Sequence, residues 1–355
     1  MLGKTAPGLT QIEKWQLGCR YNSFFMKIWC VLAFLFALAT AAAGQSTLSP
    51  DPRPAPPAAQ RQPGTVGGGS AADDNADSTT TIVKTVNEVN LVFTVTDRHG
   101  HFIKDLKRDD VKVLDDNKPA LISSFSSQTD LPLRVGLLID ASSSIRDRFR
   151  FEQEAAIEFL NQIIRSSSDE AFVLGFDSVS EITQDFTDDT GKLAHGIRRL
   201  RPGGGTALFD AIYEASKSKL ANAHAKVPTR RAIILLSDGE DNQSRVTREQ
   251  AIEMAQRAEV IVYVISTNIS GIKTRGDKVL ERFAETTGGL VFFPRKLDEV
   301  AQAFTQIEDE LRSQYALAYK PAEFVADGRF HTIAVESSRK GLRIRSRRGY
   351  YAPKR

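Results

Sequence analysis

Three side chains that offer oxygen ligands follow a mostly apolar run at alternate positions. The run covers residues 133–139, and Asp140, Ser142 and Ser144 come directly after it. A buried strand that ends in one carboxylate and two hydroxyls brings three hard oxygen atoms to one point. Such a set is what a cation like Mg²⁺ requires of a protein.

Two later segments carry the same kind of ligand. Thr206 follows three glycines on a loop, and Asp238 follows a second apolar run over residues 232–236. Each motif alone is commonly a helix cap or a turn, and no Lys-Ser or Lys-Thr pair makes the glycines a phosphate-binding loop. Together, in this order and at strand ends, they predict a metal site. Glu240 and Asp241 are interpreted as solvated turn residues, with tuning of the site's field as the other interpretation.

These residues resemble the metal-ion-dependent adhesion site of von Willebrand factor type A domains, where Asp-x-Ser-x-Ser is followed by Thr and then Asp. All five positions match, namely Asp140, Ser142, Ser144, Thr206 and Asp238. The resemblance implies that they hold Mg²⁺, or Mn²⁺ or Ca²⁺ in its place, directly or through water. Because Mg²⁺ usually keeps water ligands, an Asp or Glu of a protein partner can replace one of them. This mechanism is binding without bond breaking, so the chain is expected to be no enzyme.

The segment 131–312 alternates between two kinds of pattern. Short, continuously apolar runs are typical of strands buried on both faces. They occur at 172–176, 232–236, 260–265 and 290–293, after the mostly apolar run at 133–139. Amphipathic stretches lie between or after them, at 152–164, 207–220, 248–258 and 298–311. This alternation predicts a doubly wound, mostly parallel, Rossmann-like α/β sheet. Ligands bind such sheets at the carboxyl ends of the strands, where the strand order reverses, and Asp140 and Asp238 both stand at carboxyl ends.

The flanking segments 82–130 and 313–355 have β-type patterns. Alternating or apolar runs occur at 89–95, 111–114, 121–125, 315–319, 331–335 and 342–345. Each half is too short to bury a core alone, so we expect one β module with the α/β domain inserted between its halves. The flanks also resemble accessory segments of exported bacterial von Willebrand A-related proteins.

Residues 1–44 have the features of a signal peptide. Lys27 precedes an apolar stretch over 28–39, and small residues follow at 41–44. The stretch is shorter than the ~20 residues that span a bilayer, so cleavage is favoured over a membrane anchor. Met26 is the more typical start. Residues 45–81 are rich in Pro, Gly and Ser, and predict an extended linker on a protein exported to the periplasm, the cell surface or the medium.

A metal-dependent hydrolase is one alternative, because paired carboxylates can serve a glycosidase. Both tryptophans and both cysteines of the chain lie within residues 1–44. The mature protein would therefore lack tryptophan for sugar stacking and thiols for catalysis. None of the five histidines, His99, His101, His195, His224 and His331, sits beside a nucleophile motif.

Binding of a polyanion is the other alternative. The chain carries a C-terminal basic run of Arg339, Lys340, Arg343, Arg345, Arg347, Arg348, Lys354 and Arg355. Alternate arginines from Arg343 onward would share one strand face and contact an anionic glycan or lipid headgroup. A solvated edge strand that is protected against aggregation explains the same pattern. A net charge of +3 in 355 residues and the expected export give no support for nucleic-acid binding.

Overall fold

The computed structural model describes residues 88–127, 131–146, 148–221, 229–268 and 270–354. They all belong to one compact unit, Thr80–Arg355. The predicted leader (1–44) and linker (45–81) lie outside the described residues. Within the described part of the chain, no helix is long and apolar enough to cross a membrane.

A six-stranded sheet forms the centre of the α/β part, with the order β6-β5-β4-β7-β8-β9. Its strands are β4 (Leu133–Asp140), β5 (Glu170–Phe176), β6 (Ser180–Thr187), β7 (Arg230–Ser237), β8 (Val260–Ser266) and β9 (Val291–Phe292). All neighbours pair in parallel except β5 and β6. The doubly wound, mostly parallel sheet is therefore confirmed, and its strand order reverses between β4 and β7.

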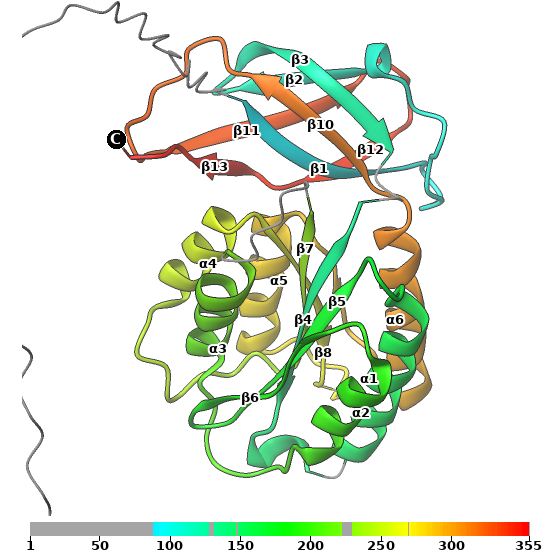
Figure 1. Ribbon diagram of the computed structural model, residues 1–355, viewed down its shortest axis with the longest axis vertical. Coiled ribbons are helices and arrows are strands. Elements are labelled where there is room, and N and C mark those ends of the chain that lie inside the picture. Colours follow the sequence, from blue (N-terminus) through cyan, green and yellow to red (C-terminus); the bar gives the residue numbers. More distant parts are fainter. Residues whose placement is uncertain (1–87, 128–130, 147, 222–228, 269, 355) are drawn as a thin grey trace, which may run out of the picture. The chain divides into compact units, whose positions relative to one another are not determined.

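Helices cover both faces of this sheet (Figure 1). Alternate residues of β4 point to opposite sides: Leu137 and Ile139 lie in one apolar cluster and Leu138 in the other. The first cluster is covered by α1 (Phe149–Ile163), α2 (Thr190–Arg199) and α6 (Leu297–Leu311). The second is covered by α3 (Leu208–Glu214), α4 (Arg248–Arg257) and α5 (Arg275–Thr287). The predicted helix over 207–220 is α3 continued by a π-helical stretch, Ala215–Leu220.

A second sheet has seven strands in the order β12-β1-β10-β3-β2-β11-β13, and all its pairings are antiparallel. Strands from before the α/β segment are β1 (Val89–Thr96), β2 (Val111–Asp115) and β3 (Lys118–Ser127). Strands from after it are β10 (Tyr315–Lys320), β11 (Phe330–Ser337), β12 (Arg343–Ser346) and β13 (Gly349–Tyr351). Because β10 pairs with both β1 and β3, the two flanks build one sheet around the insertion, which we call the β module.

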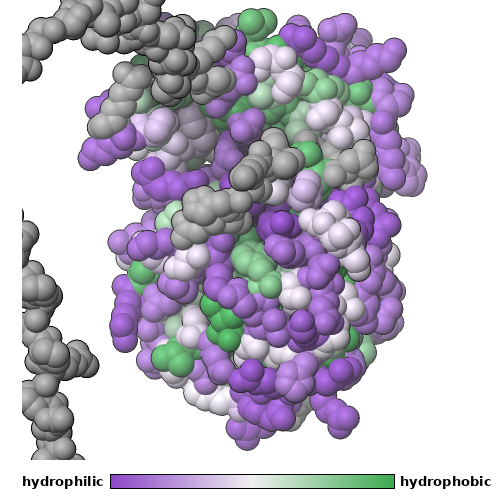
Figure 2. Space-filling view, viewed as in Figure 1, coloured by the Kyte–Doolittle hydropathy of each residue, from purple (hydrophilic) through white to green (hydrophobic). Residues whose placement is uncertain are grey.

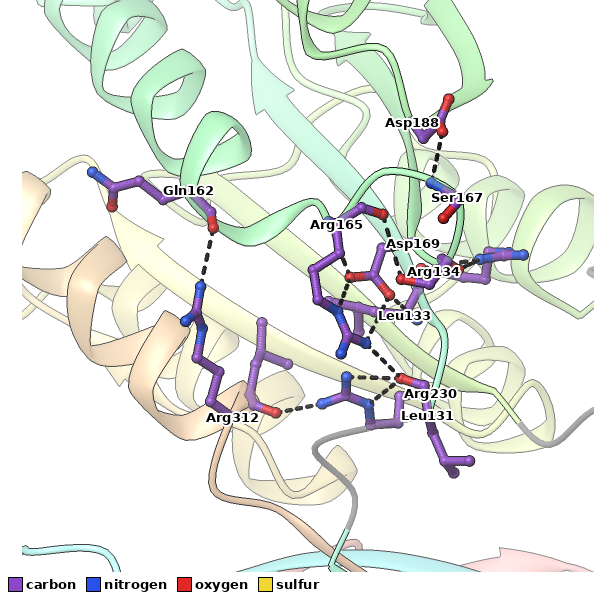
Figure 3. A network of polar contacts seen from close by, with 12 residues as sticks. Leu131, Leu133, Arg134, Gln162, Arg165, Ser167, Asp169, Asp188, Arg230 and Arg312 are labelled. Carbon is purple, nitrogen blue, oxygen red and sulfur yellow. Dashed lines mark hydrogen bonds and ion pairs between the residues drawn. The ribbon is translucent and has the colours of Figure 1, made fainter.

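Polar contacts fix the amino end of β4 (Figure 3). Asp169 accepts hydrogen bonds from the Leu133 backbone N–H at 2.8 Å and from the Arg165 guanidinium at 2.8 Å. Arg230, at the start of β7, donates to the carbonyl oxygen of Leu131 at 2.9 Å. These bonds hold the amino ends of β4 and β7 side by side, and so they set which residues meet at the carboxyl ends.

Candidate metal centre

The predicted ligands lie at the carboxyl ends of two adjacent strands. Strand β4 ends at Asp140, and Asp238 directly follows the end of β7. The register pairs Ile139 with Leu236, so Asp140 comes level with Ser237. The Ser237 hydroxyl donates to Oδ2 of Asp140 at 2.7 Å. The two predicted acids therefore lie at the point where the strand order reverses.

Hydrogen bonds bring four of the five predicted residues together. The backbone N–H of Ser142 donates to Oδ1 of Asp140 at 2.9 Å, and the hydroxyls of Ser142 and Ser144 lie 3.0 Å apart. Ser144 in turn donates to Oδ2 of Asp238 at 3.0 Å. These contacts form a continuous hydrogen-bonded chain from one strand end to the other.

The loop that carries Thr206 is held beside the first loop by its backbone. The Gly203 N–H donates to the carbonyl oxygen of Ala141 at 2.7 Å, and the Ser143 hydroxyl donates to the carbonyl oxygen of Gly204 at 2.9 Å. Thr206 itself is buried, and its N–H donates to Oδ1 of Asn242 at 2.9 Å. The third predicted segment thus lies next to the other two.

Burial divides the site into an inner and an outer side. Asp140, Ser142 and Thr206 are buried, Asp238 is half-buried, and Ser144 is exposed. A cation among these oxygens would be closed off by the protein on the Asp140 side and would meet solvent on the Ser144 side. The arrangement therefore leaves room for a ligand to approach from outside.

Keeping the buried acids at this edge charged costs free energy when no cation is bound. Burial raises the pKa of Asp140 to about 6, and the nearby Asp238 adds to this effect, while hydrogen bonds from Ser142 and Ser237 oppose it. Burial likewise raises the pKa of Glu152, in the first turn of α1, to about 7, with Asp140 and Asp238 contributing and Arg148 opposing. Among the described residues, Oε2 of Glu152 finds no hydrogen-bond partner.

This donor set fits a divalent cation. Carboxylates and hydroxyls are the hard oxygen ligands that Mg²⁺ and Ca²⁺ take, and a dication would compensate charges that the buried acids otherwise hold at a cost. The residues that could hold such an ion are Asp140, Ser142, Ser144, Thr206 and Asp238.

Sequence reasoning missed several residues of this edge. The sequence suggests no role in the site for Ser237, which follows the apolar run 232–236, or for Glu152, which begins the amphipathic stretch 152–164. Asp241 is expected to be a solvated turn residue but is half-buried in the structure: its Oδ2 accepts from the backbone N–H of Phe209 at 3.1 Å and from the hydroxyl of Ser244 at 2.5 Å. It therefore ties the Asp238 loop to the start of α3, whereas Glu240 is exposed as expected.

Two glycines allow the Asp238 loop to pack against α5. Gly239 has a φ of +80°, a conformation that favours glycine. A β-carbon at Gly276, in the first turn of α5, would lie 2.2 Å from the carbonyl oxygen of Asp238. The backbone of the acidic loop thus touches the helix directly.

The C-terminal arginines do not form one solvated face. Arg345 pairs with the buried Glu310 of α6, and Arg347 is 9% exposed and pairs with Glu259 at 3.2 Å. Arg348 pairs with Glu285 at 2.9 Å, and Arg343 is exposed. Four of the eight basic residues expected to meet a polyanion, Arg339, Arg345, Arg347 and Arg348, are therefore paired with acids of the same chain.

Among the described residues, Asp115, Asp116 and His331 of the β module form another group with metal-ligating atoms close together. Each already has a partner within the protein. Tyr319 donates to Asp115 at 2.7 Å, and Nδ1 of His331 lies 2.8 Å from Oδ2 of Asp116. The group is explained as a hydrogen-bond network that joins β2, β10 and β11.

Residues 135–240 match the von Willebrand factor type A domain family. No curated protein matches the chain. Similar solved structures include mussel byssus proximal thread matrix protein 1 with a zinc-occupied MIDAS motif, at 16% identity, 54% of this chain, 48% of that chain and a TM-score of 0.45. The von Willebrand domain of the type V pilus tip protein Mfa5 from Porphyromonas gingivalis is 16% identical, over 50% of this chain and 94% of that chain, with a TM-score of 0.39.

A mutant of the PilB minor pilin from Streptococcus sanguinis is 14% identical over 52% of this chain, with a TM-score of 0.42. The chain covers 62% of the length of the pilin. It covers about half the length of the mussel protein, with 49% and 50% covered in two further structures of that protein. We infer no function from structures that are this distantly similar. The fold is assigned from the family match and from the strand order of the sheet. The six-stranded sheet of this chain has the fold of a von Willebrand factor type A domain, the family that residues 135–240 match.

Proposed function

We propose that the carboxyl edge between β4 and β7 is a metal-ion-dependent adhesion site that captures an acidic side chain of a protein partner. Asp140, Ser142, Ser144, Thr206 and Asp238 are its ligands. The observation that carries the proposal is the chain of contacts from Asp140 through Ser142 and Ser144 to Asp238, which joins two strand ends. Mg²⁺ is the proposed ion, with Mn²⁺ or Ca²⁺ as substitutes.

The proposed ligands differ in charge and in position, and each would contribute differently to holding the ion. Asp140, buried and held by Ser142 and Ser237, supplies a fixed negative charge on the inner side. The hydroxyls supply neutral oxygen atoms, so two acids face a dication and little net charge remains. A bound ion supplies an electrophilic position for one more carboxylate oxygen. The exposed Ser144 marks the side from which that carboxylate approaches.

The proposed role of the site is to bind a partner and not to catalyse a reaction. The described histidines lie on other parts of the fold: His99, His101 and His331 belong to the β module, and His195 belongs to α2. The side chains gathered at the edge are oxygen ligands suited to holding a cation.

The proposal includes export, which the leader-like sequence of residues 1–44 and the linker-like sequence of 45–81 support. Mass spectrometry of the native protein tests it. We expect an N-terminus near Gln45, and detection of an intact Met1 or Met26 would contradict cleavage.

Titration calorimetry of Mg²⁺ and Mn²⁺ into metal-stripped protein tests the site. Wild type should bind one ion, and Asp140→Ala should bind none. Glu240→Gln is the matched control, because Glu240 is an exposed acid two positions from Asp238 and is no proposed ligand. Equal binding by wild type and Asp140→Ala would show that the ion binds elsewhere.

A further inference from the structure

Two of the most exposed large apolar side chains of the described residues lie at the same edge as the proposed site. Val179 is 66% exposed and Ile272 is 74% exposed. On the face shown in Figure 2, hydrophobic residues form small, separate patches among hydrophilic ones. Single exposed apolar residues are ordinary on protein surfaces. These two differ because each stands on a loop that is fastened to a loop of the site.

Val179 stands on the turn after β5. Its N–H donates to Oδ1 of Asp177 at 3.0 Å, which closes the turn. The neighbouring Ser178 accepts a hydrogen bond from the Gly205 N–H at 2.9 Å, and the Ala207 N–H donates to the carbonyl oxygen of Asp177 at 2.7 Å. The turn is thus bonded on both sides of Thr206.

Ile272 stands on the loop after β8. The loop begins with Thr267, whose N–H donates to the carbonyl oxygen of Ser237 at 3.0 Å. Asn268 donates to the carbonyl oxygen of Ile272 at 2.9 Å and to Oδ2 of Asp277 at 2.8 Å. This loop is therefore fastened to the end of β7 and to the start of α5, and Ile272 is held out into solvent on a braced turn.

The spacing of the strands gives the scale of this surface. Strands β5, β4, β7 and β8 are consecutive in the sheet, so their ends span three gaps of about 4.8 Å, or about 14 Å. The proposed metal ligands lie between them. An extended segment advances about 3.3 Å per residue and points every second side chain to the same face. Four residue steps of such a segment, from two positions before a residue to two positions after it, cover about 13 Å, close to the span of these strand ends.

We propose that the partner presents an extended segment in which an acidic residue is flanked by an apolar residue two positions before it and another two positions after it. The acid meets the metal site, and the apolar side chains pack on Val179 and Ile272. The inference rests on the proposed function and adds the chemistry of the segment that is recognised. Because both loops are already braced, little ordering is needed when the segment binds.

Synthetic peptides test this proposal by fluorescence anisotropy in Mg²⁺. The probe has the core Leu-Ser-Asp-Ser-Leu between Gly-Ser ends. A second peptide replaces both leucines with serine, a third moves them to Leu-Leu-Ser-Asp-Ser, and a fourth replaces Asp with Asn. We expect the probe to bind about a hundredfold more tightly than the serine peptide, because each buried apolar side chain contributes roughly tenfold in affinity. The shifted peptide should bind weakly, and the Asn peptide should not bind.

Protein variants separate this inference from the proposed function. Val179→Ser and Ile272→Ser should each weaken probe binding about tenfold and should leave Mg²⁺ binding unchanged. Val325→Ser, at a residue of the β module that is 52% exposed, is the control and should change neither. Equal binding of probe, serine and shifted peptides, or no peptide binding by a protein that binds Mg²⁺, would overturn the inference alone. Failure of the wild type to bind Mg²⁺ would overturn the proposed function with it.

Discussion

Asp140 is fully buried, and its carboxylate receives hydrogen bonds from Ser142 and Ser237. An ion that binds only the folded protein stabilises it by about 1.4 kcal/mol at tenfold excess over its Kd. The melting temperature of stripped protein should therefore rise with added Mg²⁺. Asp140→Ala should remove this rise and should melt close to stripped wild type. Differential scanning calorimetry with and without EDTA measures both, and an equal rise in the variant would contradict the site.

From the raised pKa values we make a second prediction, on how the stability of the metal-free protein depends on pH. The pKa of Glu152 rises from 4.5 to about 7 on folding, so the folded, metal-free protein keeps a proton that the unfolded chain loses in this window. Its stability should therefore fall as pH rises from about 4.5 to about 7, by an amount on the order of 3 kcal/mol. Asp140, with a folded pKa of about 6, acts in the same direction.

Urea unfolding in EDTA across this pH range measures the effect. Glu152→Gln cannot titrate, so its stability should fall less steeply than that of wild type between pH 4.5 and 7. A metal would hold the nearby acids in their charged form, so Mg²⁺ should stabilise the protein more at pH 7 than at pH 5. Parallel curves for wild type and Glu152→Gln would show that Glu152 does not titrate as described.

The ligand residues could be predicted because their types and order are informative in themselves. Asp140, Ser142 and Ser144 follow one apolar run, and Asp238 follows another. Glu152 could not be predicted, because nothing in an amphipathic helix shows that one of its acids turns inward. Ser237 was missed for a related reason: its role depends on the pairing register between β4 and β7, which a single sequence does not contain.

At the scale of elements, continuously apolar strands were predictable, and the weaker elements were not. Edge strand β6 is largely polar and half-exposed, so it lacks the apolar run of a buried strand. Helix α2 contains Gly191 and Gly196, which lower helix propensity. Helix α5 begins with a capping box formed by Thr274 and Asp277 and ends at Gly288 with a φ of +87°. These signals are local, and they lie outside the apolar and amphipathic runs on which the predicted elements rest.

The contact between α5 and the Asp238 loop carries a third prediction. Gly276→Ala would bring a β-carbon within 2.2 Å of the Asp238 carbonyl oxygen, so the loop must shift. We expect a lower melting temperature and a weaker Mg²⁺ effect, although Gly276 is no ligand. Gly203→Ala is the control, because a β-carbon there meets nothing within 4 Å. Similar calorimetric results for both variants would mean that this packing does not position Asp238.

For the whole molecule, the ion pairs of the C-terminal arginines give a fourth prediction. Glu310 is fully buried and bonds to Arg345 and to the Tyr263 hydroxyl. Arg345→Gln leaves this carboxylate without its charged partner, which should lower the free energy of unfolding by about 3 kcal/mol or more. Arg348→Gln breaks only the exposed pair with Glu285 and should cost at most about 1 kcal/mol. Urea unfolding compares them, and equal losses would contradict a special role for the buried pair.

The insertion of the α/β sheet into the β module decides how the protein would bear force. The chain leaves β3 at Ser127 and enters β4 at Leu133, and β4 then runs its whole length to Asp140. A pull between a captured partner and the β module would be transmitted through β4 and through the second connection, from α6 to β10. Strand β4 pairs with β5 and with β7 over seven residues each. Force that enters at Asp238, at the end of β7, and leaves through the start of β4 would load the hydrogen bonds between these two strands together in shear, and would not peel them apart one by one.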